Sequence, residues 1–379
     1  MFGWLAAGPP LLSLLYLLWQ RRNLRFWHQA HRPATRPLHR PLPTLAVVVP
    51  FRNEAPHLPG LVTDLLAQDY PADRYEIILV DDHSEDGGAA GAVPTNTNIR
   101  VLRLRDHPPA PDTRAYKKAA LQLGIAHARS EVIVTTDADC RCPPTWLSTL
   151  ADEFVGGADV VLGPVFVTPA RNFCEGFQAL DLAAYQLFTA ATVAAGTPAL
   201  ANGANFAFRR AAFTAVNGYA GVDHLPSGDD VLLLHKFVAD GRFTVAVSAQ
   251  ARGLVDTRPV GGWRALWDQR LRWAGKAGHY GSEALKQAQV LAYLTSLGVL
   301  LGLLFGFWDW RFALGGLLAW AIKAGIDLRL LRAVCRHYGH PGLLRWYAAA
   351  QLLYPFYLVG VGSAALLGLR AGWKGRPPA

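Results

Sequence analysis

Charged side chains are scarce in this chain. Only 17% of its 379 residues are Asp, Glu, Lys or Arg, whereas 51% are hydrophobic. So few charges indicate that part of the surface faces lipid rather than water. The length allows one large domain with accessory segments, and the formal net charge is +9.

Glycine-rich phosphate cradles and paired zinc-type cysteines are missing. The sequence contains neither G-x-G-x-x-G nor G-x-x-x-x-G-K-[ST], so a metal and side chains would have to hold the phosphates of any bound nucleotide. Cys140 and Cys142 form a C-x-C pair, but zinc sites usually combine two C-x₂₋₄-C pairs. We interpret them as small buried residues, with a thiolate metal site as the alternative.

Three long runs without charge are present, and each is long enough to span a bilayer. They cover residues 2–19, 287–308 and 346–369. Basic residues follow the first run rather than precede it, which predicts an uncleaved anchor rather than a signal peptide. A weaker run over 312–326 contains Lys323 and predicts the return arm of a hairpin turning at 308–311.

Arginines beside these runs predict the orientation of the chain. The two basic stretches are Arg21, Arg22, Arg25, Arg32, Arg36 and Arg40, and then Arg329, Arg332, Arg336 and Arg345. Both should face the cytoplasm, which predicts a multi-pass protein of a bacterial inner membrane, with four spans and a cytoplasmic central block. The basic tail would then face outward, against the same rule. Because the basic stretches flank apolar runs, they suit anionic headgroups better than nucleic acid.

The expected segments follow from these features. They are an anchor (1–20), a basic linker (21–44), a cytoplasmic block (45–261), an amphipathic interface helix (262–286), a membrane region (287–370) and a tail (371–379). Within the block, expected strands lie at 45–51, 76–81, 99–104, 132–136 and 159–165, and expected helices at 57–68 and 113–128, with another opened by Pro143 and Pro144. This alternation predicts an α/β fold with a mainly parallel sheet and helices on both faces.

Acidic residues occur in three clusters within this block. They are Asp81-Asp82, Asp137 with Asp139, and Asp229-Asp230. The first two follow buried strands, and ligands of parallel sheets gather at the carboxyl ends of strands. Several unpaired carboxylates cannot be buried together, so they require cations, most simply a divalent metal with its phosphate ligand. The clusters therefore predict an active site.

These residues carry a resemblance to a known family. VVPFRNE (48–54), VDDHS (80–84), DAD (137–139), GDD (228–230) and QRLRW (269–273) resemble, in this order, the motifs of family 2 glycosyltransferases. The similarity is greatest to the membrane-embedded subgroup with cellulose and hyaluronan synthases and ceramide glucosyltransferase. It covers about residues 45–276. It implies a Rossmann-like GT-A fold with one N-terminal and about three C-terminal transmembrane helices.

The resemblance also implies residues that bind the donor nucleotide. Pro50 and Glu54 match a proline-containing turn whose backbone approaches the base. Asp82 would accept hydrogen bonds from uracil or ribose, whereas Asp81 has the alternative use of capping a loop. Lys117, in a K-x-x-A-L pattern, would lie near the nucleotide unless it is a solvated helix lysine.

The D-x-D and GDD motifs imply the metal site and the base. Asp139 would coordinate Mg²⁺ or Mn²⁺ on the diphosphate, and Asp137, in the same metal site, would touch the donor ribose or sugar. A capped turn is the structural alternative. Asp230 matches the general base that deprotonates an acceptor hydroxyl, and one displacement would give a β-linked product. Asp229 stands where many members have glutamate, and it could instead cap the following helix.

QRLRW falls on a predicted helix over 262–280. One face holds Trp263, Leu266, Trp267, Arg270 and Trp273, and another holds Gln269, Arg272 and Lys276. The resemblance places Gln269 and Arg272 in the donor site, with Arg272 on the diphosphate, and Trp273 near the acceptor. The alternative is a plain amphipathic interface helix with Trp273 in the core.

Residues 182–208 also lack charge, but a membrane span there would separate the D-x-D motif from the base. We expect instead a helix beneath the acceptor path, with 202–205 lining that path. The expected reaction is metal-dependent transfer of a hexose from a nucleotide sugar, UDP-linked, to a membrane lipid. A processive β-polysaccharide synthase is the alternative, disfavoured by the small span count. A catalytically inactive membrane scaffold is disfavoured by the intact carboxylate set.

Overall fold

The computed structural model describes residues 6–31, 41–87, 99–108, 114–369 and 371–372. The chain forms two compact units. The sheet unit consists of Ala30–Thr168 and Pro198–Arg258, and the helical unit of Met1–Gln29, Pro169–Thr197 and Pro259–Pro378. The block expected over 45–261 is therefore interrupted, because Pro169–Thr197 packs with the other apolar helices.

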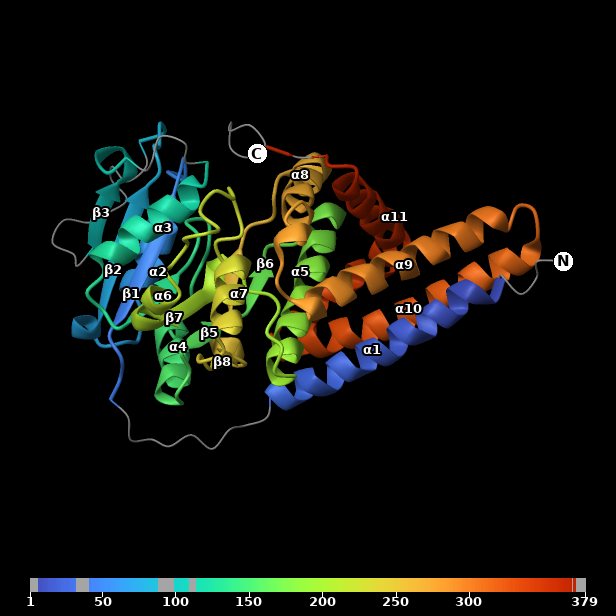
Figure 1. Ribbon diagram of the computed structural model, residues 1–379, viewed down its shortest axis with the longest axis horizontal. Helices are drawn as coiled ribbons and strands as arrows, with labels where there is room; N and C mark the ends of the chain where they lie inside the picture. The colour runs from blue at the N-terminus through green and yellow to red at the C-terminus, as the bar shows by residue number, and fades with distance from the viewer. Residues whose placement is uncertain (1–5, 32–40, 88–98, 109–113, 370, 373–379) are drawn as a thin grey trace. The chain divides into compact units, whose positions relative to one another are not determined.

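The sheet unit is built on seven strands in the order β3-β2-β1-β4-β7-β5-β8 (Figure 1). The strands are β1 (Leu45–Phe51), β2 (Tyr75–Asp81), β3 (Ile99–Arg103), β4 (Val132–Thr135), β5 (Val160–Leu162), β7 (Phe206–Arg209) and β8 (Val245–Val247). Only β7 runs antiparallel to its neighbours among these strands. The predicted mainly parallel α/β sheet is confirmed.

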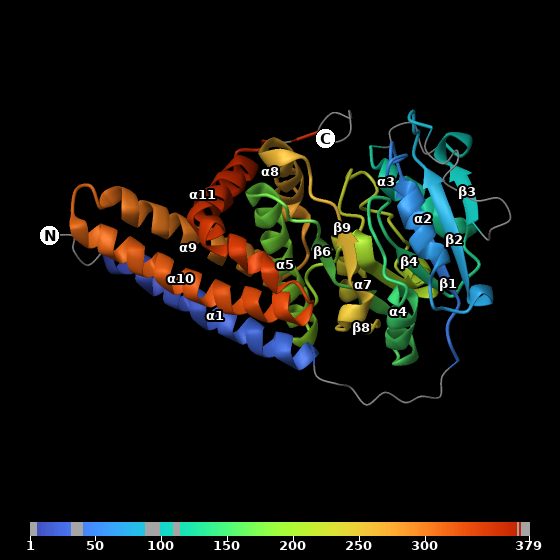
Figure 2. The ribbon, with the colours of Figure 1, turned by 180° about the vertical axis from the view of Figure 1, so that it is seen from behind.

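Helices cover the sheet on both faces, as Figures 1 and 2 show from opposite sides. They are α2 (Leu58–Leu66), α3 (Tyr116–His127), α4 (Trp146–Val155), α6 (Arg210–Ala215) and α7 (Val231–Asp240). Consequently β1 is buried along its whole length. Pro143 and Pro144 lie before the N-cap of α4 rather than in its first turn, because the helix starts at Trp146.

The strand expected over 159–165 is broken into β5 and β6 (Val165–Val167), and β6 pairs with β9 (Val255–Thr257) in a separate two-stranded sheet. Gly163 lies at the break and donates its backbone N–H to the carbonyl of Asn205 at 2.8 Å. Its backbone approaches so closely that a Cβ would lie 2.1 Å from the Asn205 side chain. The following Pro164 has no N–H with which to continue a ladder.

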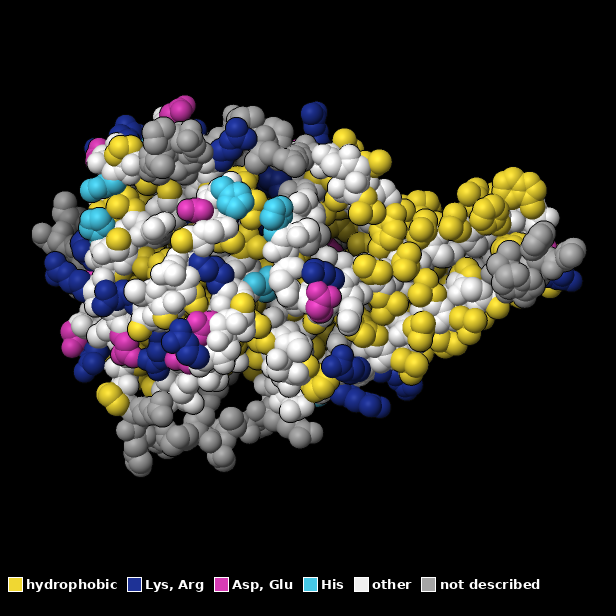
Figure 3. Space-filling model, viewed as in Figure 1, with side chains coloured by type: hydrophobic (Ala, Val, Ile, Leu, Met, Phe, Trp, Pro, Cys, Tyr) yellow, Lys and Arg dark blue, Asp and Glu magenta, His cyan; other side chains and the backbone are white. Residues whose placement is uncertain are grey.

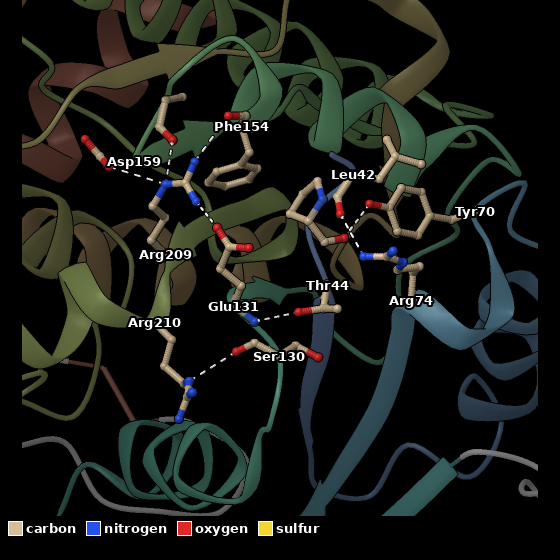
Figure 4. Close-up of polar contacts among 12 residues, drawn as sticks. Leu42, Thr44, Tyr70, Arg74, Ser130, Glu131, Phe154, Asp159, Arg209 and Arg210 are labelled. Atoms are coloured by element: carbon tan, nitrogen blue, oxygen red, sulfur yellow. Dashed lines mark hydrogen bonds and ion pairs between the residues drawn. The ribbon is translucent and has the colours of Figure 1, made fainter. Parts of the chain in front are cut away.

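Arg209, the last residue of β7, holds this antiparallel strand between β4 and β5 (Figure 4). It pairs with Glu131 and Asp159, and it donates to the Phe154 carbonyl at 3.2 Å. Arg210 donates to the Ser130 carbonyl at 3.1 Å. These contacts hold β7 at the end of the sheet where β4 begins, leaving the opposite end to the acidic clusters.

The described residues of the helical unit form six long helices. They are α1 (Gly8–Ala30), α5 (Phe173–Ala194), α8 (Gly262–Ala274), α9 (Glu283–Phe305), α10 (Trp310–His337) and α11 (Tyr347–Leu366). α9 and α10 form the predicted hairpin, with Asp309 capping α10 through the Arg311 N–H at 2.9 Å. Their backbones approach closely, since a Cβ on Gly302 would lie 2.7 Å from the Cα of Gly316. The charge-free run 182–208 is not one helix. Helix α5 ends at Ala194, and the last three residues of the run, 206–208, belong to β7.

Two described segments, Glu283–Phe305 and Pro341–Leu366, are long and apolar enough to cross a membrane. Hydrophobic side chains cover the surface along α9 and α10 (Figure 3), and Phe307, Trp308 and Trp310 at the hairpin turn are mostly exposed. α1 does not meet the same criterion over its described residues. It continues without interruption past position 20 through the arginines to Ala30, which makes its second half polar.

Candidate functional site

The loops after β1 and β2 hold the first group of predicted donor residues. Asp82 is buried, and its Oδ1 lies 3.0 Å from Nδ1 of His83. Asp81 accepts the Ser84 N–H at 2.8 Å, which confirms its predicted use as a loop cap. Glu54 lies 2.7 Å from Nδ1 of His57.

Pro50 differs from the expectation of a turn residue. It lies inside β1, opposite Val80 of β2, and is buried. The turn itself follows the strand and is marked by Asn53, which has a φ of 53°. Because Asn53 accepts the Glu85 N–H at 2.9 Å, the loops after β1 and β2 are tied to each other.

Lys117, at the start of α3, lies at the centre of the acidic site. Its ammonium is 2.7 Å from Asp137 after β4 and 3.1 Å from Asp229 before α7. The Lys117 side chain is 26% exposed, so it is neither a solvated surface lysine nor a core residue. Two of the three predicted acidic clusters therefore meet at one cation.

The charge balance at Lys117 favours its ammonium form. Burial by itself lowers the pKa of Lys117, but the charges of Asp137 and Asp229 outweigh burial and raise that pKa well above 10.5. Asp229 is buried, and Asp137 is half-buried. The lysine thus offsets carboxylate repulsion that would otherwise oppose assembly of the site.

Asp230 caps α7, so the alternative in which Asp229 caps this helix is wrong. One oxygen of Asp230 accepts the Val231 N–H at 2.7 Å, and the other accepts the Gly203 N–H at 3.0 Å. Asp229 points instead to Lys117. Because two backbone donors on separate segments hold it, the Asp230 carboxylate has a defined orientation.

The Gly203 segment corrects a second expectation about residues 202–205. Asn205 is fully buried, accepts from Trp146 Nε1 at 2.9 Å, and donates to the carbonyls of Pro164 and Gly253. It anchors the fold and cannot line a path for an acceptor. Gly203 is the residue of this segment that contacts the acidic site.

The donor set fits a divalent metal that is shared with a diphosphate. Among the described residues, no three His, Cys, Asp or Glu side chains are grouped to hold a metal ion. Asp137 and Asp139 nevertheless supply hard oxygen donors after β4, and Mg²⁺ commonly binds one or two carboxylates together with substrate phosphates. Burial raises the pKa values of the Cys140 and Cys142 thiols. The negative charge of Asp139 raises the pKa of Cys140 further. These thiols are thus poor metal ligands.

The QRLRW segment lies on α8 of the helical unit. Leu266, Arg270 and Leu271 are buried there, whereas Trp273 and Arg272 are half-buried. Arg270 lies on the predicted apolar face but is paired with Asp181 at 2.9 Å. Arg272 donates to the Gly372 carbonyl at 3.1 Å.

The roles of three residues in these sites were missed by sequence reasoning. Lys118 is buried and donates to the carbonyls of Val222 and Leu225 at 2.6 and 2.8 Å, which fixes the loop before Asp229. Gly203 was expected to line the acceptor path, and its bond to Asp230 carried no signal in the sequence. Asp181 carried one, because it is the only charged residue between Glu175 and Arg209, and a buried charge needs a partner.

The sequence matches the profiles of two known groups of proteins. Residues 46–215 match the profile of glycosyl transferase family 2, and residues 132–362, more than half of the chain, match that of glycosyl transferase family group 2. The chain belongs to this glycosyltransferase family. The predicted GT-A fold of the glycosyltransferase is confirmed as well. Mannosyltransferase PcManGT from Pyrobaculum calidifontis, solved with GDP-Man and Mn²⁺, superposes with a TM-score of 0.57 at 21% identity, covering 97% of this chain and 99% of that one.

Two curated relatives of the glycosyltransferase match over shorter stretches. Undecaprenyl-phosphate 4-deoxy-4-formamido-L-arabinose transferase of Aeromonas hydrophila is 32% identical over 31% of this chain and 35% of its own length. Glycosyltransferase AglE of Haloferax volcanii is 29% identical over 34% of this chain and 41% of its own length. The chain thus spans 35% and 41% of the length of these two relatives.

Proposed function

We propose that this glycosyltransferase is a membrane-bound, inverting, metal-dependent enzyme. It transfers a hexose from a nucleotide sugar, UDP-linked, to the hydroxyl of a membrane lipid and forms a β-glycosidic bond. The observation that carries the proposal is the acidic site of the sheet unit. There Asp137 and Asp229 share Lys117, and Asp230 is held beside them by Gly203.

Each residue of the sheet unit has a chemical role in this proposal. Asp82 accepts hydrogen bonds from the uracil or ribose, and Asp137 and Asp139 hold Mg²⁺ or Mn²⁺ together with the diphosphate. When bound, the metal supplies Lewis-acid stabilisation of the leaving nucleoside diphosphate. Lys117 supplies a further positive charge close to Asp137.

Asp230 acts as the general base. It takes the proton from the acceptor hydroxyl as that oxygen attacks the anomeric carbon, while the bond to the diphosphate breaks. A carboxylate can accept about four hydrogen bonds, so the N–H groups of Val231 and Gly203 do not prevent this role. In the helical unit, Gln269 and Arg272 act on the donor, and Trp273 acts on the acceptor.

The helical unit supports a lipid acceptor and membrane location. Tyr16 donates to Asp327 at 2.7 Å, and the ring of Trp27 meets that of His337 with centroids 5.4 Å apart. α1 and α10 therefore run side by side in the same direction, which brings the arginine-rich ends of both helices together. A basic end beside apolar helices suits the cytoplasmic headgroup layer, and it supports a cytoplasmic catalytic site in an inner membrane.

A lipid phosphate is the second candidate acceptor, because one relative is named for undecaprenyl-phosphate. Membranes containing the enzyme should be incubated with labelled nucleotide sugars, and organic-soluble products separated from polymeric ones. The proposal predicts label in the organic fraction, in a linkage that survives mild acid. A glycosyl phosphate would be cleaved by that treatment, and label in polymer would support the processive synthase instead.

A further inference from the structure

Arg270 in the middle of α8 carries an ion pair for which the proposed chemistry has no use. Its Nε donates to Oδ2 of Asp181 on α5 at 2.9 Å, and the two side chains are only 4% and 2% exposed. Tyr357 of α11 donates to the same carboxylate oxygen at 3.2 Å. The pair therefore fixes α8 against two other helices of the helical unit.

Arg270 also contacts two other residues of QRLRW, Gln269 and Trp273. Its Nη1 donates to Oε1 of Gln269 at 2.5 Å. Its guanidinium carbon lies 4.2 Å from the ring centroid of Trp273, within the range of a cation–π contact. One buried side chain thus determines the orientation of a residue on either side of it.

A buried ion pair adds little net stability to a fold compared with an apolar pair. Removing both charges from water costs about as much as their attraction returns, so apolar pairs of similar volume are often equally stable. What apolar side chains cannot reproduce is the direction of the guanidinium plane, which is set here by Asp181, itself held by Tyr357. Gln269 and Trp273 both contact the guanidinium, so its orientation determines theirs.

We propose that Asp181 and Arg270 are positioning residues, which hold Gln269 and Trp273 in the geometry required for sugar transfer. The inference rests on the proposed function, in which Gln269 acts on the donor and Trp273 on the acceptor. Asp181 and Arg270 touch neither substrate themselves. They act through the two motif side chains.

The test replaces the pair by apolar residues in the double variant Asp181→Leu/Arg270→Met. Thermal stability should be retained, since both charges are removed together. Transfer should fall by on the order of 10²-fold, as expected when a reacting group is displaced by about 1 Å. The ratio of transfer to acceptor-independent hydrolysis of the nucleotide sugar should also fall, because Trp273 addresses the acceptor.

A matched control exists in the same unit. Lys323 and Asp327 form a second buried pair, also supported by a tyrosine hydroxyl, from Tyr16, and they contact no residue of QRLRW. Lys323→Met/Asp327→Leu should keep the transfer-to-hydrolysis ratio of the unaltered enzyme. If the Asp181 and Arg270 variant matches this control in stability and in ratio, the pair is only structural and the inference is wrong.

Arg270→Lys provides an independent readout where the double variant does not accumulate. Lysine keeps the charge for Asp181 but lacks the planar fork that reaches Gln269 and stacks on Trp273. Reduced transfer with an unchanged thermal midpoint supports the positioning role of Arg270, and full transfer overturns it.

Gln269→Ala and Trp273→Ala distinguish a failure of the proposed function from a failure of the positioning role. If both alanine variants retain full transfer, the proposed role of QRLRW is wrong. If both lose transfer while Arg270→Lys keeps it, only the positioning role is wrong.

Discussion

Asp230 combines two functions that substitution can separate, because its carboxylate both caps α7 and is the proposed base. Asp230→Asn leaves one oxygen to accept the Val231 N–H, and asparagine caps helices about as well as aspartate. The bond from Gly203 is lost, since an amide has only one acceptor oxygen. A buried N–H without its partner costs about 1–3 kcal/mol. Asp230→Ala loses the cap as well, which adds about 1 kcal/mol.

The two variants should therefore differ in stability but not in activity. Asp230→Asn and Asp230→Ala should both lower turnover by about 10²- to 10⁴-fold, the usual contribution of a positioned acid or base. Thermal denaturation should place the alanine variant roughly 2–4 °C below the asparagine variant, as expected for about 1 kcal/mol in a domain of this size. Titration with UDP should show donor binding retained in Asp230→Asn, because the proposed uracil and metal contacts come from Asp82 and Asp139.

Arg209→Met provides the control for destabilisation alone. It removes the contacts with Glu131 and Asp159 at the far end of β4 (Figure 4), so stability should fall while turnover per folded molecule stays the same. Turnover close to that of the unaltered enzyme in Asp230→Asn would refute the assignment. If Asp229→Asn loses turnover while Asp230→Asn keeps it, the base is Asp229.

Four further predictions concern the acidic site and the membrane topology. Chelation with EDTA should abolish transfer and Mn²⁺ or Mg²⁺ should restore it, and full activity after exhaustive chelation would contradict a role for Asp137 and Asp139 in metal binding. Cys140→Ala should keep the same metal dependence in that assay, because its thiol has a raised pKa and is buried. Lys117→Met should destabilise the fold by about 1–3 kcal/mol. Because the folded-state pKa of Lys117 is raised, the difference in unfolding free energy between this variant and the unaltered enzyme should be constant below pH 10.5 and shrink above it. A reporter fused at Ser282 should behave as cytoplasmic and one at Trp310 as external, and the reverse pattern would refute the proposed topology.

Much of the sheet and the identity of the acidic clusters could be predicted from short stretches of sequence. Buried parallel strands read as continuous apolar runs, so β1, β2 and β4 were placed to within a residue or two. The D-x-D pair follows β4 directly, which located it at the carboxyl end of a strand without further information. The α9–α10 hairpin was equally local, because its turn lies between two apolar runs.

Tertiary structure decided the partner of each charge, because an ion pair joins side chains whose separation along the chain carries no signal. Lys117, Asp137 and Asp229 come from three different segments of the chain. Asp230 rather than Asp229 caps α7 because Gly203 and Val231 present their N–H groups to it. Arg270 and Asp181 are 89 residues apart. The sequence alone was enough to identify the family and the acidic residues of the proposed site. Folding alone determined which carboxylate faces a cation and which faces a backbone donor, since that choice depends on segments brought together by packing.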